Sequence, residues 1–277
     1  MEVMTRSRAR IQPLTAEVGA EVRDVDLEHL DDEMFERMQK AFFDRTMLVI
    51  RRDTPLAPDA QLAFTRRWGE VYITPYVKKL DGYPEVLPVV NWGKAKTVTE
   101  AWHSDATFQP EPPGIAILAA QTLPAAGGDT MFANCCAAYD ALSETMKKML
   151  EGLRAIHVDT VLAKFAGVED PNAKPQSHPV VRTHAVTGRK SIFVNPLFTQ
   201  HFDGMSREES RGLLEFLFSH LTKHEFVYRH RWQQGDIVMW DNRCVLHRAQ
   251  PWDMHEPRIM WHTRVAGDGV NEFAMTR

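Results

Sequence analysis

The sequence predicts a mainly β protein, a β-sandwich or jelly roll with a few helices packed on the outside. Its 277 residues, 44% hydrophobic and 25% charged, have an ordinary globular composition and are enough to bury a large core. Many short apolar or alternating runs are separated by Gly, Pro, Asn and Asp, a pattern typical of strands joined by turns. Because these runs do not alternate regularly with helical segments, a doubly wound parallel sheet is not expected.

Three segments have apolar residues at helical spacing, three and four positions apart. The first begins after Asp31, and the second covers 137–153. The third begins at Ser206, which forms a capping box with Glu209, and continues through Leu221. The first two are expected to be amphipathic packing helices, and the third is expected to lie on a sheet.

Eight runs are predicted to be strands: 47–50, 115–120, 130–133, 180–184, 191–194, 226–230, 237–240 and 259–265. A loop rich in Pro and Gly, 122–130, connects two of them. The stretch 159–177 has two prolines and no clear period, which indicates a mobile loop or active-site lid. Since no internal repeat is present, 1–277 is interpreted as a single domain, with 1–10 as a flexible tail.

Charge and cysteine content limit the partners and the compartment. The net charge of −4 and the pI near 6.3 give no reason to expect a nucleic-acid or membrane-surface partner. The longest apolar stretch, 115–120, is far shorter than the roughly 20 residues of a membrane helix. Cys135, Cys136 and Cys244 are too few and too oddly placed for a disulfide framework. We therefore expect a reducing, cytoplasmic location.

The sharpest chemical motif is His103-Ser104-Asp105, preceded by Trp102. On an extended strand, side chains at i and i+2 share a face. An imidazole and a carboxylate on one face, joined by a distant histidine, make the two-histidine, one-carboxylate triad of non-haem Fe(II) sites. Alone, the tripeptide arises easily by chance, and surface hydrogen bonding is then the plainer interpretation.

His247 is the strongest candidate for the third ligand. It follows 235–243, which has the pattern of a turn, a core strand and a tight turn, so His247 is expected on the next strand. Eleven residues later Arg258 begins the run 259–265. A fixed arginine beside a metal is a bidentate clamp for a carboxylate. From spacing alone, a surface charge at a strand start is the plainer interpretation of Arg258.

Together these motifs, with 127–130 and 240–243 between them, resemble the Fe(II)- and 2-oxoglutarate-dependent dioxygenases of the taurine dioxygenase and 2,4-dichlorophenoxyacetate dioxygenase family. Order and spacing match, and the resemblance covers nearly the whole chain, from 11–14 to 265–267. It implies a double-stranded β-helix, a jelly-roll variant, and a homo-oligomer, commonly a dimer or tetramer.

Residue by residue, the resemblance implies that His103, Asp105 and His247 bind iron and that Thr130 and Arg258 hold the distal carboxylate of 2-oxoglutarate. Three protein ligands leave three positions, enough for 2-oxoglutarate to chelate and for O2 to bind. The implied reaction hydroxylates a substrate C–H and releases succinate and CO2. Next to an oxygen or a sulfonate, that hydroxylation cleaves ethers, sulfate esters and C–S bonds. Trp240 and Asn242 are assigned to shaping the strand and turn before His247.

The substrate positions differ from those of taurine-specific members. His262 stands where those members have a sulfonate-binding arginine, four positions after Arg258, and Thr74 and Thr99 replace two further contact residues. The segments 226–232 and 240–267 look closer to the aryloxyalkanoate-degrading members. We expect a small organic anion, with an aryloxyalkanoate carboxylate favoured and taurine, another alkylsulfonate or an alkyl sulfate as alternatives. Lys78 or His262 would pair with that anion.

Two other classes stay open at this point. A zinc hydrolase also uses two histidines and a carboxylate with an open position, but it leaves Arg258 and 127–130 without a role. A non-catalytic metal-binding jelly-roll sensor would keep the pocket without turnover, because fold does not fix function.

Overall fold

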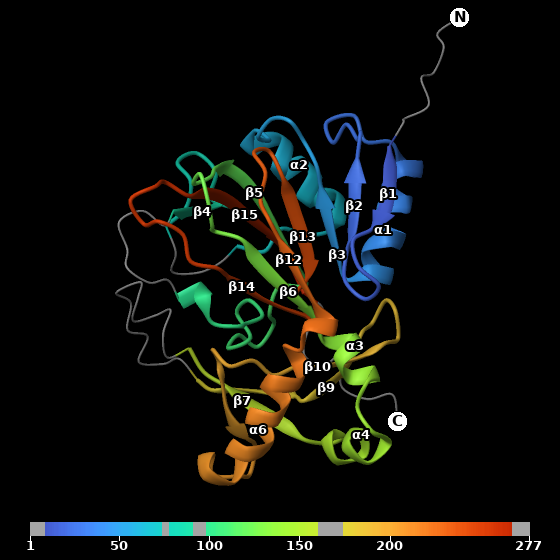
Figure 1. The fold of residues 1–277 in the computed structure, drawn as a ribbon, viewed down its shortest axis with the longest axis vertical. Helices are drawn as coiled ribbons and strands as arrows, with labels where there is room; N and C mark the ends of the chain where they lie inside the picture. Colours follow the sequence, from blue (N-terminus) through green and yellow to red (C-terminus); the bar gives the residue numbers. More distant parts are fainter. Residues whose placement is uncertain (1–8, 74–77, 91–97, 160–173, 268–277) are drawn as a thin grey trace, which may run out of the picture.

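The computed structural model describes residues 9–73, 78–90, 98–159 and 174–267, and it confirms a mainly β protein with helices on the outside (Figure 1). The strands are β1 (Arg10–Pro13), β2 (Ala20–Arg23), β3 (Met47–Ile50), β4 (Leu87–Val90), β5 (Ile115–Thr122), β6 (Thr130–Asn134), β7 (Arg154–His157), β8 (Gln176–Pro179), β9 (Val181–Thr183), β10 (Lys190–Ile192), β11 (Thr199–Phe202), β12 (Val227–His230), β13 (Ile237–Asp241), β14 (Val245–Ala249) and β15 (Ile259–Val265). The helices are α1 (Asp32–Arg45), α2 (Pro58–Trp68), α3 (Cys135–Asp140), α4 (Glu144–Leu150) and α6 (Arg207–Leu221), with short 3-10 turns η1 (Val98–Glu100) and η2 (His224–Phe226).

Two sheets form the centre of the molecule. The larger has the order β1-β2-β3-β13-β5-β15-β4, and a three-stranded sheet has the order β12-β6-β14. Every pair in both is antiparallel except β2 with β3. Two further small sheets, β11-β7-β8 and β10-β9, lie with α3, α4 and α6 at one end of the molecule, the lower end in Figure 1.

The alternation of side chains along β13 explains how the layers are held together. Val238 and Trp240 belong to a buried cluster that also contains Phe132 of β6 and Val245 of β14, so this face of the large sheet meets the small sheet. Ile237 and Met239 point the other way, into the cluster formed with α1 and α2. Burial on both faces makes β13 a continuous apolar run.

Two of the three predicted helices are confirmed. Asp31 caps α1, its side chain accepting a hydrogen bond from the Met34 amide. The capping box of Ser206 and Glu209 is present at the start of α6, which ends at Leu221 as expected.

The prediction of one helix over 137–153 is wrong, because the segment divides into α3 and α4. Asn134 caps α3, and the Ser143 side chain accepts a hydrogen bond from the Met146 amide and starts α4. A serine that caps a new helix interrupts the old one, since its hydroxyl competes for backbone groups. The chain then turns after Leu150 and enters β7.

Each of the eight predicted runs contains a strand, and 122–130 is a connection between β5 and β6 as expected. The strands β1, β2, β4, β7, β8 and β11 and the helix α2 were not predicted. Residues 1–8 of the predicted tail lie outside the described residues, whereas Arg10 already pairs with Arg23 in β1–β2. Most of the predicted lid, 160–173, also lies outside them. In the described part of the chain, no helix is long and apolar enough to cross a membrane.

Candidate metal and cosubstrate site

Three buried side chains from two distant parts of the chain converge between the sheets. The ligand atoms of His103, Asp105 and His247 all lie within 4.8 Å of one another. The Nε2 atom of each histidine is 3.8 Å from Asp105 Oδ1. Among the residues that the structure describes, this is the only group of three or more such side chains spaced to hold a metal ion. The structure thus brings together all three residues that the sequence predicts as ligands.

Backbone pairing fixes the two histidines. The His103 amide donates to the His247 carbonyl at 3.0 Å and the His247 amide donates to the His103 carbonyl at 2.8 Å, which sets the rings 4.1 Å apart. His103 Nδ1 lies 2.8 Å from the Ala101 carbonyl oxygen. A proton on Nδ1 makes that hydrogen bond and leaves Nε2 free to bind a metal.

Asn242, in the turn between β13 and β14, holds the backbone of Asp105. Its Oδ1 accepts a hydrogen bond from the Asp105 amide at 2.6 Å, and its Nδ2 donates to the Asp105 and Pro113 carbonyls, each at 2.9 Å. Ala106, the residue directly after Asp105, has a left-handed φ of 51°. Besides forming the turn before His247, Asn242 therefore holds the backbone of Asp105, the predicted carboxylate ligand.

The electrostatics of the cluster favour a metal-binding protonation state. Burial lowers the pKa of His103 and of His247, so both rings are neutral near pH 7. Burial alone would raise the pKa of Asp105, but Arg264 and then the surrounding histidines outweigh it and hold that pKa well below its usual range. Two neutral imidazoles and one ionised carboxylate are the forms that coordinate a cation.

Arg258 is 2% exposed and lies at the other end of the small sheet. Its guanidinium carbon is 5.9 Å from the Trp232 ring centre and 5.3 Å from that of Trp252, and its Nε donates to the Gly128 carbonyl at 3.2 Å. Burial lowers the pKa of Arg258 to about 10, which still leaves it charged at pH 7. No carboxylate of the described residues pairs with it, so this buried cation is suited to binding an anion.

Thr130 begins β6 and is 3% exposed. Its Oγ1 accepts a hydrogen bond from Trp232 Nε1 at 3.0 Å, so Trp232 contacts both Thr130 and Arg258. In the β14–β6 register His247 is opposite Phe132 and Ala249 is opposite Thr130. Thr130 therefore lies on the same face as His247, one pleat along.

The four predicted substrate residues have different positions. His262 is buried, with Nε2 3.5 Å from Asp105 Oδ2, and burial followed by Arg264 lowers its pKa to about 3. Thr99 is half-buried on η1, Lys78 is exposed, and Thr74 lies outside the described residues. Their substrate roles remain predictions.

Sequence reasoning missed two cations beside the site, Arg264 and Lys79. Arg264 Nε donates to Asp105 Oδ2 at 3.1 Å, and Lys79 lines a pocket next to it. The i, i+2 spacing of His262 and Arg264 on β15 was a usable signal, since it places both on one face.

Comparison with known proteins agrees with this geometry. The model of the taurine catabolism dioxygenase TauD, TfdA family matches residues 10–265. The chain is 34% identical over 289 residues to an (S)-phenoxypropionate/α-ketoglutarate dioxygenase of Sphingobium herbicidovorans, covering 96% of this chain and 97% of that protein. It is 36% identical over 281 residues to the α-ketoglutarate-dependent 2,4-dichlorophenoxyacetate dioxygenase of Cupriavidus pinatubonensis, covering 93% and 98%. The crystal structure of a taurine dioxygenase from Burkholderia xenovorans superposes with a TM-score of 0.83 at 31% identity, covering 95% of this chain and 94% of that one.

Fold, site and comparisons define an α-ketoglutarate-dependent dioxygenase, α-ketoglutarate being the same compound as 2-oxoglutarate. The chain belongs to the taurine catabolism dioxygenase TauD, TfdA family.

Proposed function

We propose that His103, Asp105 and His247 hold Fe(II) and that the chain uses it to hydroxylate a small organic anion. The donor set supports this: two Nε2 atoms and one carboxylate oxygen converge, and three protein ligands leave an octahedral ion room for cosubstrate and O2. When bound, the metal would supply the oxidising power for C–H hydroxylation, driven by conversion of 2-oxoglutarate and O2 into succinate and CO2. The protein residues bind, orient and enclose the reactants.

Thr130 and Arg258 would bind the distal carboxylate of 2-oxoglutarate. The Arg258 guanidinium is buried and has no carboxylate partner among the described residues. Trp232 lies beside it and also donates a hydrogen bond to the buried Thr130 hydroxyl, so the two predicted contacts are near each other. The planar fork of Arg258 matches two carboxylate oxygens, and burial strengthens that pairing. Trp232 and Trp252 would exclude water from it.

The favoured substrate is an aryloxyalkanoate carboxylate, oxidised at the carbon next to its ether oxygen. Relatives named for phenoxypropionate and 2,4-dichlorophenoxyacetate cover nearly the whole chain. An alkylsulfonate, taurine included, or an alkyl sulfate is the alternative, because a taurine dioxygenase has the same fold. We also infer that the two facing sheets form the double-stranded β-helix of a single domain.

Anaerobic optical titration of the metal-free protein with Fe(II) and 2-oxoglutarate tests the site. We expect a visible charge-transfer band in wild type, its loss in His103→Ala, and a band in Arg258→Ala only at much higher 2-oxoglutarate concentration. A fully metal-loaded wild-type protein without this band would contradict the proposal and favour the zinc hydrolase or sensor interpretation.

Succinate formation then tests the substrate. We expect stimulation by phenoxyacetate-type carboxylates, and stimulation only by neutral analogues would contradict an anionic substrate. Stronger stimulation by alkylsulfonates or alkyl sulfates would select the alternative class.

A further inference from the structure

Beside the metal site, β15 presents a second pair of polar side chains to Asp105. His262 and Arg264 share one face of the strand, and both reach Asp105 Oδ2, at 3.5 Å and 3.1 Å. The other carboxylate oxygen, Oδ1, faces the two histidine ligands. Arg264 thus contacts the oxygen of Asp105 that does not face the two histidines, and it lies directly beside the predicted metal site.

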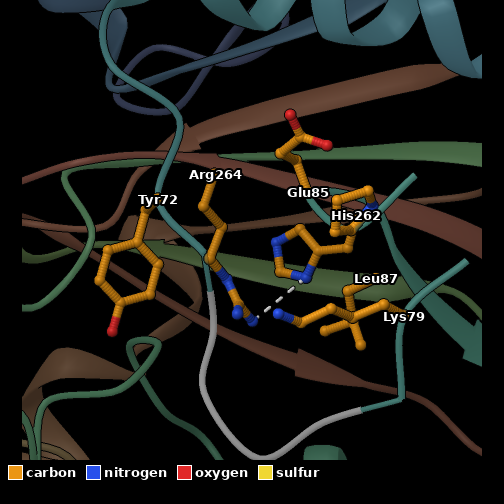
Figure 2. Close-up of a pocket in the computed structure, with 7 residues that line it drawn as sticks. Tyr72, Lys79, Glu85, Leu87, His262 and Arg264 are labelled. Atoms are coloured by element: carbon orange, nitrogen blue, oxygen red, sulfur yellow. Dashed lines mark hydrogen bonds between the residues drawn. The ribbon is translucent and has the colours of Figure 1, made fainter. Parts of the chain in front are cut away.

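Arg264 also lines a small pocket, shown in Figure 2. The pocket is tight: its cavity volume is about 10 Å³, room for about one water molecule, and Tyr72, Lys79 and Leu87 complete its wall with His262. A small head group therefore enters it only if a wall side chain such as Lys79 shifts outward, and the rest of a ligand must lie outside it.

Two positive charges meet in that pocket. Figure 2 shows the Lys79 ammonium group and the Arg264 guanidinium directed toward one another. Lys79 has no hydrogen-bond or ion-pair partner among the described residues. The one carboxylate among the lining residues, Glu85, is paired with Arg66 at 3.1 Å and points away from Arg264. Like charges directed into one space repel unless an anion lies between them.

A metal would increase this excess of positive charge. Among the described residues, the carboxylate paired with Arg264 is Asp105, and that carboxylate is a predicted metal ligand. With a divalent cation bound, the region around Arg264 and Lys79 carries net positive charge, which attracts anions.

We propose that Arg264 and Lys79 bind the anionic head group of the substrate, a carboxylate, sulfonate or sulfate, in the pocket with Tyr72 and His262. The proposal rests on the proposed function and adds the residues that select the substrate. Arg264 offers a planar fork of donors, and Lys79 offers a point charge from the opposite wall. An anion held there is next to Asp105, so the remainder of the substrate extends from the edge of the metal site. Neither residue was among the sequence-predicted substrate contacts.

Lys79 gives the cleaner test because, unlike Arg264, it does not contact a predicted metal ligand. Lys148→Met is the matched control, since it removes the same charge from an exposed position on α4, at the opposite end of the molecule from β4 and β15 (Figure 1). We would measure dissociation constants of phenoxyacetate, butanesulfonate and butyl sulfate by calorimetry under anaerobic conditions, on the protein loaded with Fe(II) and 2-oxoglutarate. Phenoxyacetamide serves as the neutral counterpart of phenoxyacetate.

We expect Lys79→Met to weaken binding of the best anion by about tenfold, the loss of one charge-assisted contact. Lys148→Met should bind it as wild type does, and the affinities for Fe(II) and 2-oxoglutarate should be unchanged in both variants. Equal losses in Lys148→Met and Lys79→Met would indicate a general charge effect and overturn the proposal. A loss of 2-oxoglutarate affinity in Lys79→Met would assign the pocket to the cosubstrate and also overturn it.

The same calorimetry on metal-free protein separates this proposal from the iron assignment. Arg264→Gln should lose at least tenfold in anion affinity there, where a change in metal binding has no part. If anion binding depends on Arg264 and Lys79, but the wild-type protein shows no charge-transfer band after it is fully loaded with Fe(II) and 2-oxoglutarate, the iron proposal is refuted and the pocket is kept. No saturable binding of any of the three anions to the loaded wild-type protein would refute the pocket.

Discussion

Gly128 and Arg258 are in direct contact, and a side chain at position 128 would fit only if Arg258 shifted. A Cβ built on Gly128 would lie 3.1 Å from both Cδ and Nε of Arg258. The Gly128 carbonyl accepts the hydrogen bond from Arg258 Nε at 3.2 Å, and its backbone has a left-handed φ of 69°. The glycine of the 127–130 motif therefore sets the position of the predicted cosubstrate clamp.

Gly128→Ala is expected to raise the KM for 2-oxoglutarate by about tenfold, because Arg258 must shift to accommodate the methyl group. The matched control is Gly188→Ala, which has a nearly equal φ of 68° but nothing within 4 Å of the added Cβ. Both variants should lose roughly 1 kcal/mol of stability from the left-handed backbone. Steady-state kinetics and urea unfolding check this; an equal KM in both alanine variants would show that the contact has no functional effect.

Asn242→Ala is expected to weaken metal binding by about 10- to 100-fold, the usual effect of removing a residue that orients a ligand. It removes both hydrogen bonds to the Asp105 backbone. Asn242→Asp separates the accepted hydrogen bond from the donated ones. The new carboxylate can still accept from the Asp105 amide, but it has no N–H group to donate to the Asp105 and Pro113 carbonyls. We expect an intermediate metal affinity in the aspartate variant, measured by calorimetric titration with Fe(II) or Mn(II). Wild-type affinity in Asn242→Ala would show that the loop positions Asp105 without it.

The cluster of His103, Asp105 and His247 was predictable because its signals are local or ordered along the chain. His103 and Asp105 lie two residues apart, and the turn that precedes His247 indicates the strand that carries it. The close contact that requires Gly128 is not visible in the sequence, although its motif was recognised. Sequence patterns therefore indicate which residues form the site, whereas the distances between those residues are known only from the folded structure.

The anion pocket could not be found in this way because strand pairing assembles it. Lys79 and Tyr72 are nearly 200 positions from Arg264, and they meet only because β15 pairs with β4 and Val71 forms a bridge with Val265. Lys78 and Lys79 look alike in the sequence, and only the fold shows which of them faces the pocket. The division of the helix over 137–153 was missed for a related reason: apolar periodicity continues past Ser143, whereas a single hydroxyl ends the helix.

His178 is expected to make folding sensitive to acid. It is fully buried, and burial followed by Arg182 lowers its pKa to about 4, from an ordinary 6.5. Below pH 6.5 the unfolded chain takes up a proton that the folded chain refuses, so stability present above 6.5 is lost as the pH falls toward 4. Between pH 7 and pH 5 this amounts to on the order of 2 kcal/mol.

The variant His178→Gln tests this, because an amide can still donate to the Gln109 carbonyl that His178 Nε2 contacts at 3.1 Å. Urea unfolding at pH 7 and pH 5 should show a loss in the variant that is smaller than in wild type by about that amount. His255→Gln, at an exposed position, should lose as much as wild type. Equal pH dependence in wild type and His178→Gln would assign the acid sensitivity to other groups.

Asp241 is the centre of a buried ionic cluster directly before Asn242. Its carboxylate accepts hydrogen bonds from Arg243 at 2.8 and 2.7 Å and lies 2.8 Å from His184 Nε2. Asp241→Asn removes the negative charge from a site that retains Arg243, and breaking a buried pair in this way costs about 3 kcal/mol or more. Because the same turn carries Asn242, the variant should also bind metal more weakly.

Asp140→Asn is the matched control: it removes the partner of Arg189 at a carboxylate that is 61% exposed, and should cost less than about 1 kcal/mol. Comparable losses in the two variants, measured by urea unfolding, would mean that the buried cluster contributes no more than a surface pair and that another interaction holds the turn in place for Asn242.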